Sequence, residues 1–281
     1  MKLARYLADG VVGFGLVQGD EVLDLGLGDD DVMQLLAPDM WPKLAERTVS
    51  RRLPLAELTL LPPVPRSRTF LAIGLNYASH RVEAARAGMT AGAAQIWFNK
   101  QVSCINGPRS PIVLPRVSTM LDYEGELGVV IGRRARYVTA AEALDVVAGY
   151  LVVNDVSVRD WQKASPTMTL GKSFDTHGPI GPWLVSPDEV GDPQDLDLEV
   201  HVNGELRQHE STRTMIHPVR EQIAHLSQVF TLEPGDLLAT GTPEGVGALM
   251  DPPRYLREGD VVTVSISKIG RLENRVVAEA R

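Results

Sequence analysis

Hydrophobic and polar positions alternate along much of the chain, a pattern that predicts short β-strands. The clearest example is LDLEVHVNG, in which Leu196, Leu198, Val200 and Val202 fall on one face. Similar strands are predicted at FLAIGL, ELGVVIG, VVAGYLVVNDV, GDLLATG and GDVVTVSIS, separated by Gly, Pro and Asp residues typical of turns. Helical candidates are fewer, at residues 76–87, 139–147 and 216–229. The pattern predicts a strand-dominated α+β fold with a few helices.

The first 60 residues have a character of their own. KLARYL, VVGFGLVQGDEVLDL and DDDVMQLLA predict a hairpin, with a turn at Gly19 and Asp20, that leads into a helix. The following segment LLPPVPRSRTF contains three prolines and is typical of a linker. We therefore expect a small N-terminal α/β domain at residues 1–65 and a larger domain at 66–281.

Composition narrows the class of protein. The 281 residues carry a formal net charge of −8, and no basic patch interleaved with aromatics stands out, which argues against a nucleic-acid partner. The longest apolar runs, such as VVAGYLVV, are far short of the ~20 residues that span a membrane. The single cysteine, Cys104, fits a reducing cytosol, and the N-terminus shows no secretory signal, so we expect a cytoplasmic protein.

Three acids interrupt the apolar pattern in LDYEGELGVVIG, residues 121–132. Asp122, Glu124 and Glu126 would share one face of a strand, where like charges repel, so we expect a positive group among them. A hard divalent cation would suit these oxygen ligands. An exposed strand edge protected by charge is the alternative, and the pattern alone does not decide between them.

The segment VVNDVSVRDWQ offers a further carboxylate, Asp155, at the end of an apolar strand, where it could complete a metal site. Arg159 has the guanidinium fork that binds a substrate carboxylate through two hydrogen bonds. The alternative is an Asp that caps a helix beside a solvated Arg, and the local sequence fits it equally well.

GLNYASHRVEA predicts a helix that Asn76 caps. On it His80 and Glu83 stand three residues apart and can hydrogen-bond, which suits a general base that activates water. Such pairs are also common on solvated helices without any catalytic role.

Two glycine-rich segments carry further candidates. GKSFDTHGPIGPW, residues 171–183, predicts a loop in which Lys172 could polarise a carbonyl or stabilise an enolate, with His177 in a structural role. LLATGTPEGVG, residues 237–247, suggests a phosphate loop but is followed by Ala248 and Leu249 instead of the Lys and Ser or Thr that such a loop requires.

The succession of IGLNYASHRVE, YEGELGVVIG, NDVSVRDWQ, GKSFDTHGPIGP and LLATGTPEGVG resembles the fumarylacetoacetate hydrolase family, from about residue 68 to the end. Residues 1–60 resemble the short N-terminal domain of many bacterial members. The resemblance implies a mixed β-roll with a few outer helices, a homodimer, and a divalent cation, usually Mg²⁺ and sometimes Mn²⁺ or Ca²⁺.

The resemblance also implies a role for individual residues. The metal ligands would be Glu124, Glu126 and Asp155, and Asp122 falls outside that ligand pattern. The catalytic residues would be His80, Glu83 and Lys172, and the residues around the substrate Tyr77, Arg159, Gln162 and Thr242.

The implied reaction is hydrolysis of a C–C bond in a 2,4-diketo acid, such as an acylpyruvate, by water that His80 and Glu83 activate. Oxaloacetate decarboxylation and isomerisation of hydroxymuconate-type acids are alternatives on the same metal site, and a non-catalytic metal-binding scaffold is a third. The segment AARAGMTAGAAQIWFNK, residues 84–100, resembles a lid over the substrate, with a plain surface loop as the alternative. The accepted acyl group is left open by the sequence.

Overall fold

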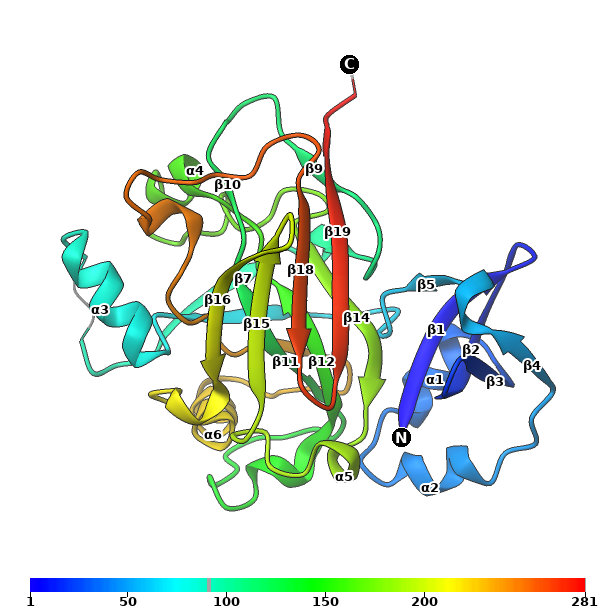
Figure 1. Cartoon of the computed structure of the whole chain (residues 1–281). Coiled ribbons are helices and arrows are strands. Elements are labelled where there is room, and N and C mark those ends of the chain that lie inside the picture. The colour runs from blue at the N-terminus through cyan, green and yellow to red at the C-terminus, as the bar shows by residue number, and fades with distance from the viewer. Residues whose placement is uncertain (90–91, 281) are drawn as a thin grey trace.

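The computed structural model describes residues 1–89 and 92–280. Strands dominate it and helices are few, which confirms the predicted fold class (Figure 1). The larger sheet runs through β4 (Arg51–Pro54), β3 (Glu21–Leu27), β2 (Val11–Gln18), β1 (Lys2–Ala8), β14 (Gly178–Val185), β12 (Val147–Asn154), β11 (Gly125–Ile131), β17 (Leu237–Ala239), β6 (Phe70–Gly74) and β7 (Ile96–Lys100). Short strands β5 (Thr59–Leu61) and β8 (Ile105–Asn106) pair with β1 and β14.

A second sheet packs against the centre of the first. Its order is β16 (Glu205–Ser211), β15 (Asp197–Val202), β18 (Val261–Ile266), β19 (Gly270–Ala278) and β9 (Ile112–Leu114), and in Figure 1 its yellow to red strands lie in front of green β11 and β12. The alternation predicted for β15 is confirmed, since Leu198, Val200 and Val202 are buried. They face the first sheet because only one side of β15 meets the core.

Strands β11 and β12 are buried along their whole length because both faces of their sheet are covered. One face meets the second sheet, and the other meets a second hydrophobic cluster that includes Val32, Trp41 and Leu44. These two strands are antiparallel neighbours, with Gly125 opposite Asn154. Acidic residues at this shared end are therefore held by the most buried part of the fold.

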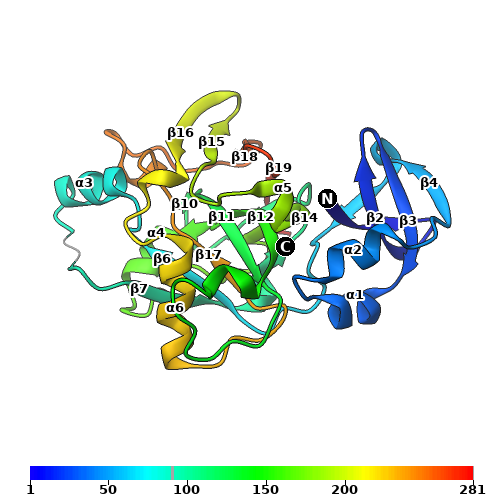
Figure 2. The same ribbon diagram turned by 90° about the horizontal axis from the view of Figure 1, so that it is seen from below.

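The N-terminal segment forms the antiparallel strands β1, β2 and β3, with the predicted turn at Gly19 and Asp20, followed by α1 (Asp29–Leu35) and α2 (Met40–Ala45). Strand β1 also pairs with β14, so one sheet continues from this segment into the rest of the molecule. Figure 2 shows the N-terminal segment at the right, with α1 and α2 beside β2 and β3. The Trp41 indole donates a hydrogen bond to the Ala148 carbonyl at 2.8 Å. The division at residue 65 stays a prediction, and the structure adds a shared sheet across it.

The remaining helices are α3 (Ala78–Arg86), α4 (Arg159–Lys163), α5 (Pro187–Val190) and α6 (Val219–Val229). The helices predicted at 76–87 and 216–229 correspond to α3 and α6. The helix predicted at 139–147 is only a 3₁₀ segment, Ala143–Val146, because Val147 already belongs to β12. Further 3₁₀ segments are Leu55–Glu57, Val102–Cys104, Thr212–Thr214 and Gly247–Leu249, and a small ladder joins β10 (Leu121–Asp122) to β13 (Ser157–Val158).

Two loop predictions were wrong in part. The segment 171–183 is a loop only as far as His177, since β14 begins at Gly178, where a side chain would lie 2.8 Å from the Cys104 sulfur. Close packing therefore explains a glycine that was attributed to a loop. The lid predicted at 84–100 ends in β7, where Trp97 and Phe98 pair with β6, and residues 90–91 of that lid lie outside the described residues.

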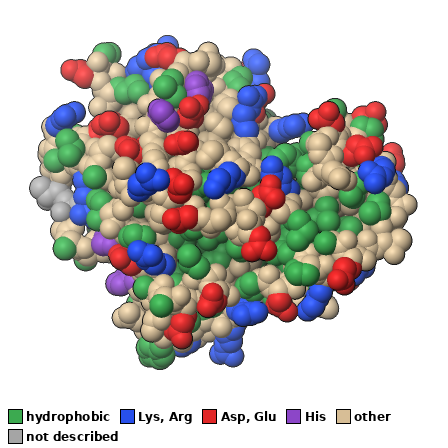
Figure 3. All heavy atoms as spheres, turned by 60° about the horizontal axis from the view of Figure 1, so that its bottom comes forward, with side chains coloured by type: hydrophobic (Ala, Val, Ile, Leu, Met, Phe, Trp, Pro, Cys, Tyr) green, Lys and Arg blue, Asp and Glu red, His purple; other side chains and the backbone are tan. Residues whose placement is uncertain are grey.

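The molecular surface is mixed in charge on the face seen in Figure 3. Acidic and basic side chains are interspersed there, and hydrophobic side chains gather toward the centre and the right. Within residues 1–89 and 92–280, no helix is both long and apolar enough to cross a membrane.

Candidate metal centre and active site

The fold brings Glu124, Glu126 and Asp155 together. Glu124 precedes β11, Glu126 lies in it, and Asp155 follows the neighbouring strand β12, so antiparallel pairing places all three at one end of the strand pair. One carboxylate oxygen from each lies within 4.8 Å of the others, and all three side chains are buried. Three convergent carboxylates match the oxygen ligands that Mg²⁺, Mn²⁺ and Ca²⁺ prefer.

Asp122 does not share a strand face with these acids, contrary to the alternation expected at 121–132. It lies in β10, a separate short strand, and accepts hydrogen bonds from the Arg159 side chain (2.8 Å) and from the backbone N–H groups of Gly247 and Ala248 (both 2.9 Å). The alternative of an exposed, charge-protected edge is also wrong, because β11 lies between β12 and β17.

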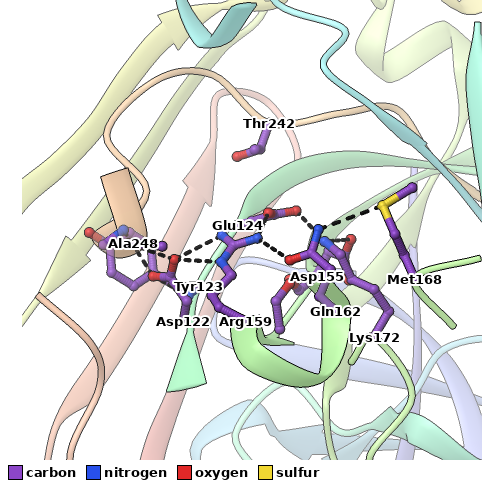
Figure 4. A network of polar contacts seen from close by, with 12 residues as sticks. Asp122, Tyr123, Glu124, Asp155, Arg159, Gln162, Met168, Lys172, Thr242 and Ala248 are labelled. Atoms are coloured by element: carbon purple, nitrogen blue, oxygen red, sulfur yellow. Dashed lines mark hydrogen bonds and ion pairs between the residues drawn. The ribbon is translucent and has the colours of Figure 1, made fainter. Parts of the chain in front are cut away.

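Arg159 and Lys172 supply the positive charge that was predicted among the acids (Figure 4). Nη1 of Arg159 donates to Glu124 at 2.6 Å and to Gln162 at 2.9 Å. Nζ of Lys172 lies 2.7 Å from both Glu124 and Asp155 and bridges them. Both cations are therefore engaged with the acids, although Arg159, Gln162 and Lys172 also line the adjoining pocket.

The pKa values of Glu124 and Glu126 are shifted in opposite directions. Burial opposes ionisation of Glu124, but Lys172 and Arg159 together hold the pKa of this carboxyl well below its usual range. Burial, and then the charges of Asp155 and Glu124, raise the pKa of Glu126 well above its usual range. The Glu126 carboxylate accepts the Gly241 backbone N–H at 2.7 Å and forms no ion pair in the described part of the chain. Glu126 thus lacks an ion-pair partner of its own within the described residues, and a divalent cation could take that place.

Sequence reasoning missed Lys100, the last residue of β7. Its ammonium is fully buried and donates to Asp155 at 2.6 Å and to the backbone carbonyl of Lys172. In the sequence it follows a short apolar run and looks like a solvated strand end. Its signal was the spacing of two from Phe98, since side chains two apart on a strand point to the same face and both are buried in β7.

His80 and Glu83 form a hydrogen-bonded pair on α3. Nδ1 of His80 lies 2.9 Å from one oxygen of Glu83, and the other oxygen accepts the Gly245 backbone N–H at 2.9 Å. His80 is buried and lines the pocket, so an incidental pair on a solvated helix does not describe it. The prediction that Asn76 caps α3 was wrong, because its side chain instead bonds the backbone of His217 and Thr240.

A pocket of about 410 Å³ connects these groups. Its wall beyond them is largely apolar. The predicted site residues that line it are His80, Glu124, Glu126, Arg159, Gln162, Lys172 and Thr242. Tyr77 is fully buried and is not part of this lining, and its hydroxyl has no partner among the described residues, so its substrate contact stays a prediction.

Comparison with known proteins identifies the family of the chain. The family described as "Fumarylacetoacetate (FAA) hydrolase C-terminal" matches residues 69–277, and that described as "Rv2993c-like, N-terminal" matches residues 1–63. A 2,4-didehydro-3-deoxy-L-rhamnonate hydrolase from Sphingomonas sp. (strain SKA58) is 48% identical over 216 residues, which cover 76% of this chain and 75% of the relative.

Two solved structures match this chain over 100% of its length and over 100% of their own. Maleylpyruvate hydrolase from Sphingobium sp. SYK-6, in complex with manganese (II) ion and pyruvate, is 32% identical with a TM-score of 0.81. The 2-hydroxyhepta-2,4-diene-1,7-dioate isomerase from Mycobacterium marinum is 34% identical with a TM-score of 0.82. The chain therefore belongs to the fumarylacetoacetate hydrolase family.

Proposed function

We propose that the protein is a divalent-metal-dependent hydrolase that cleaves a C–C bond in a 2,4-diketo acid. The observation that carries this proposal is that His80, held by Glu83, lines the same pocket as Glu124 and Glu126 of the buried Glu–Glu–Asp triad. The triad supplies ligands for a Lewis acid, and the pair supplies a general base. Hydrolysis of an acylpyruvate needs both.

Glu124, Glu126 and Asp155 would hold the cation, with Mg²⁺ expected and Mn²⁺ or Ca²⁺ as alternatives. Its chemistry would be to neutralise the negative charge that develops on the pyruvate-type leaving group. Glu126 has no ion-pair partner of its own among the described residues, which supports this assignment. The related maleylpyruvate hydrolase, named as a complex with manganese (II) and pyruvate, supports the same class of ligand.

The remaining steps fall to side chains of the pocket. Glu83 fixes Nδ1 of His80, which leaves Nε2 to take a proton from water. The hydroxide attacks the carbonyl distal to the substrate carboxylate, and the C–C bond breaks as its electrons pass to the pyruvate fragment. We assign Arg159 and Gln162 to the substrate carboxylate end, and Lys172 and Thr242 to the oxyanion.

Isomerisation on the same site is the second candidate, favoured by the likeness to the 2-hydroxyhepta-2,4-diene-1,7-dioate isomerase. Enol and keto forms interconvert by proton transfer alone, and His80 could move that proton. The two reactions differ in their products, since only hydrolysis releases two fragments.

The test is a panel of substrates with identified products. Acylpyruvates, maleylpyruvate, 2,4-didehydro-3-deoxy-L-rhamnonate, 2-hydroxyhepta-2,4-diene-1,7-dioate and oxaloacetate are each incubated with Mg²⁺ or Mn²⁺ and with a chelator. We expect metal-dependent loss of diketo absorbance and release of pyruvate with one of the first three. Isomer without cleavage would replace the proposal by the isomerase, CO₂ release by the decarboxylase, and no turnover of any compound by a metal-binding scaffold.

A further inference from the structure

Lys100 contacts the acidic triad through Asp155. Its side chain is fully buried and is not part of the pocket lining. Nζ donates to one oxygen of Asp155 at 2.6 Å and to the Val156 carbonyl at 3.4 Å, and it also contacts the Lys172 carbonyl. The ring of Phe70 lies 5.8 Å from the ammonium, so its surroundings beyond these oxygens are apolar.

A buried ammonium is costly unless a carboxylate compensates it, and the same holds for a buried carboxylate. Asp155 has one ammonium on each oxygen, Lys100 on the first and Lys172 on the second, at 2.7 Å. Lys172 also bonds Glu124, whereas Asp155 is the one carboxylate that Lys100 meets within the described residues. Asp155 is therefore the single ion-pair partner of Lys100 within the described residues.

The cluster as a whole has more acid than base. The buried ionic groups around the triad comprise four carboxylates and three cations: Asp122, Glu124, Glu126, Asp155, Lys100, Arg159 and Lys172. Without Lys100 the metal-free cluster would hold four carboxyl groups beside only two cations, Arg159 and Lys172. A divalent ion would supply the same compensation.

We propose that Lys100 is a positioning residue that serves as the resident counter-charge of Asp155 and keeps the triad assembled in the metal-free protein. This inference rests on the proposed function in one respect, the role of Asp155 as a metal ligand. Lys100 and the divalent ion are both positive and would neutralise the same carboxylate, so each repels the other. Loss of Lys100 weakens the metal-free fold more than the metal-bound fold, and by linkage it tightens metal binding.

The test compares Lys100→Met with the wild-type chain, first by calorimetric titration of Mn²⁺ and then by thermal unfolding with a chelator or saturating Mn²⁺. We expect the Mn²⁺ dissociation constant of Lys100→Met to fall by about tenfold or more, since a nearby positive charge is gone. In chelator its Tm falls by on the order of 5 °C, and saturating Mn²⁺ restores part of this loss.

Lys268→Met is the matched control, because Lys268 donates to the Val190 carbonyl at 2.9 Å and forms no ion pair within the described residues. Its Mn²⁺ affinity should match that of the wild type. Lys100→Arg, which keeps the charge, should keep the wild-type Mn²⁺ affinity, and Lys100→Gln replaces Lys100→Met if the latter does not fold.

Equal losses of Tm with and without Mn²⁺, or weaker Mn²⁺ binding in the neutral variants, would overturn this inference and leave the proposed function intact. Failure of Mn²⁺ to bind the wild-type protein at all would instead overturn the metal-dependent function, and the inference with it.

Discussion

At the scale of single residues, His80 has a role that substitution can separate from metal binding. It lines the pocket but is not part of the acidic triad. We expect His80→Ala to lower kcat by about 10²–10⁴, the usual contribution of a general base, with the Mn²⁺ dissociation constant unchanged. Steady-state kinetics and calorimetry measure the two effects. His225→Ala, on the exposed side of α6, is the control, and parallel loss of Mn²⁺ binding in His80→Ala would contradict the assigned roles.

Glu126 and Glu124 should respond differently to the same substitution. Glu126→Gln imitates a carboxyl whose pKa burial already raises, so the metal-free stability should stay within about 1 kcal/mol of wild type. Glu124→Gln removes the partner of Arg159 and Lys172 and should cost about 3–5 kcal/mol. Chemical denaturation in chelator measures both.

Metal binding completes that comparison. Glu126→Gln should weaken Mn²⁺ binding by more than the roughly 10–100-fold that follows loss of a partner to a metal ligand. A Glu126→Gln variant that binds Mn²⁺ as the wild type does would remove Glu126 from the ligand set.

Some contacts of the site residues could be predicted from the sequence and others could not. The order of motifs located Glu124, Glu126 and Asp155, and the spacing of His80 and Glu83 on a helix sufficed to pair them. That Arg159 and Lys172 bind Glu124 depends on contacts between residues 35 and 48 positions apart. Such contacts have no local pattern.

At the scale of elements, a turn connects the dyad to the second sheet. The Gly245 N–H holds Glu83, its φ is +98°, and a Cβ there would lie 2.0 Å from the Arg207 carbonyl oxygen. Gly245→Ala must therefore displace the turn and release Glu83. We expect kcat to fall by about tenfold or more, as for a misplaced general base, and stability to fall by about 1–3 kcal/mol.

Gly204→Ala provides the comparison for that turn. Gly204 also has a positive φ, +80°, but its Cβ would meet nothing within 4 Å. Backbone strain should lower the free energy of unfolding of Gly204→Ala, while its kcat stays at the wild-type value. Equal kcat in the two variants would mean that the Gly245 turn does not position Glu83.

Strands were predicted correctly where hydrophobic and polar residues alternate along the sequence. They were missed where the strand depends on pairing with segments distant in the sequence. The alternation of Leu198 and Val200 sufficed to define β15. The glycines and prolines at 178–182 predicted a loop, yet they belong to β14, because β8 and β12 pair with this part of the strand. Pairing of β1 with the end of β14 joins the N-terminal segment to the main sheet, which the prolines at 62–65 did not suggest.

At the scale of the whole molecule, two expectations remain proposals: the homodimer that the family resemblance implies and the cytoplasmic location inferred from the sequence. Light scattering on the purified chain should give twice the 30.6 kDa mass of one protomer if the first holds. A mass of one protomer across the concentrations of the assay would contradict it.

Acid stability of the whole fold should depend on His177. This side chain is buried where the loop before β14 meets β9, and Nε2 donates to the Val113 carbonyl at 2.8 Å. Burial lowers the pKa of His177 from 6.5 to about 4. The folded protein thus keeps the imidazole neutral while the unfolded chain takes up a proton, so this contribution to stability is complete above pH 6.5 and is lost as pH falls toward 4.

The contribution amounts to about 2–3 kcal/mol between pH 7 and pH 4.5, given a shift of that size. His177→Gln can still donate to Val113 but does not titrate, so its free energy of unfolding should decline less over this range than that of the wild type. Urea denaturation at a series of pH values measures the difference, with His225→Gln as the control for loss of an imidazole. Parallel declines for wild type and His177→Gln would show that other groups govern acid unfolding, and that the junction between the two sheets is not its weak point.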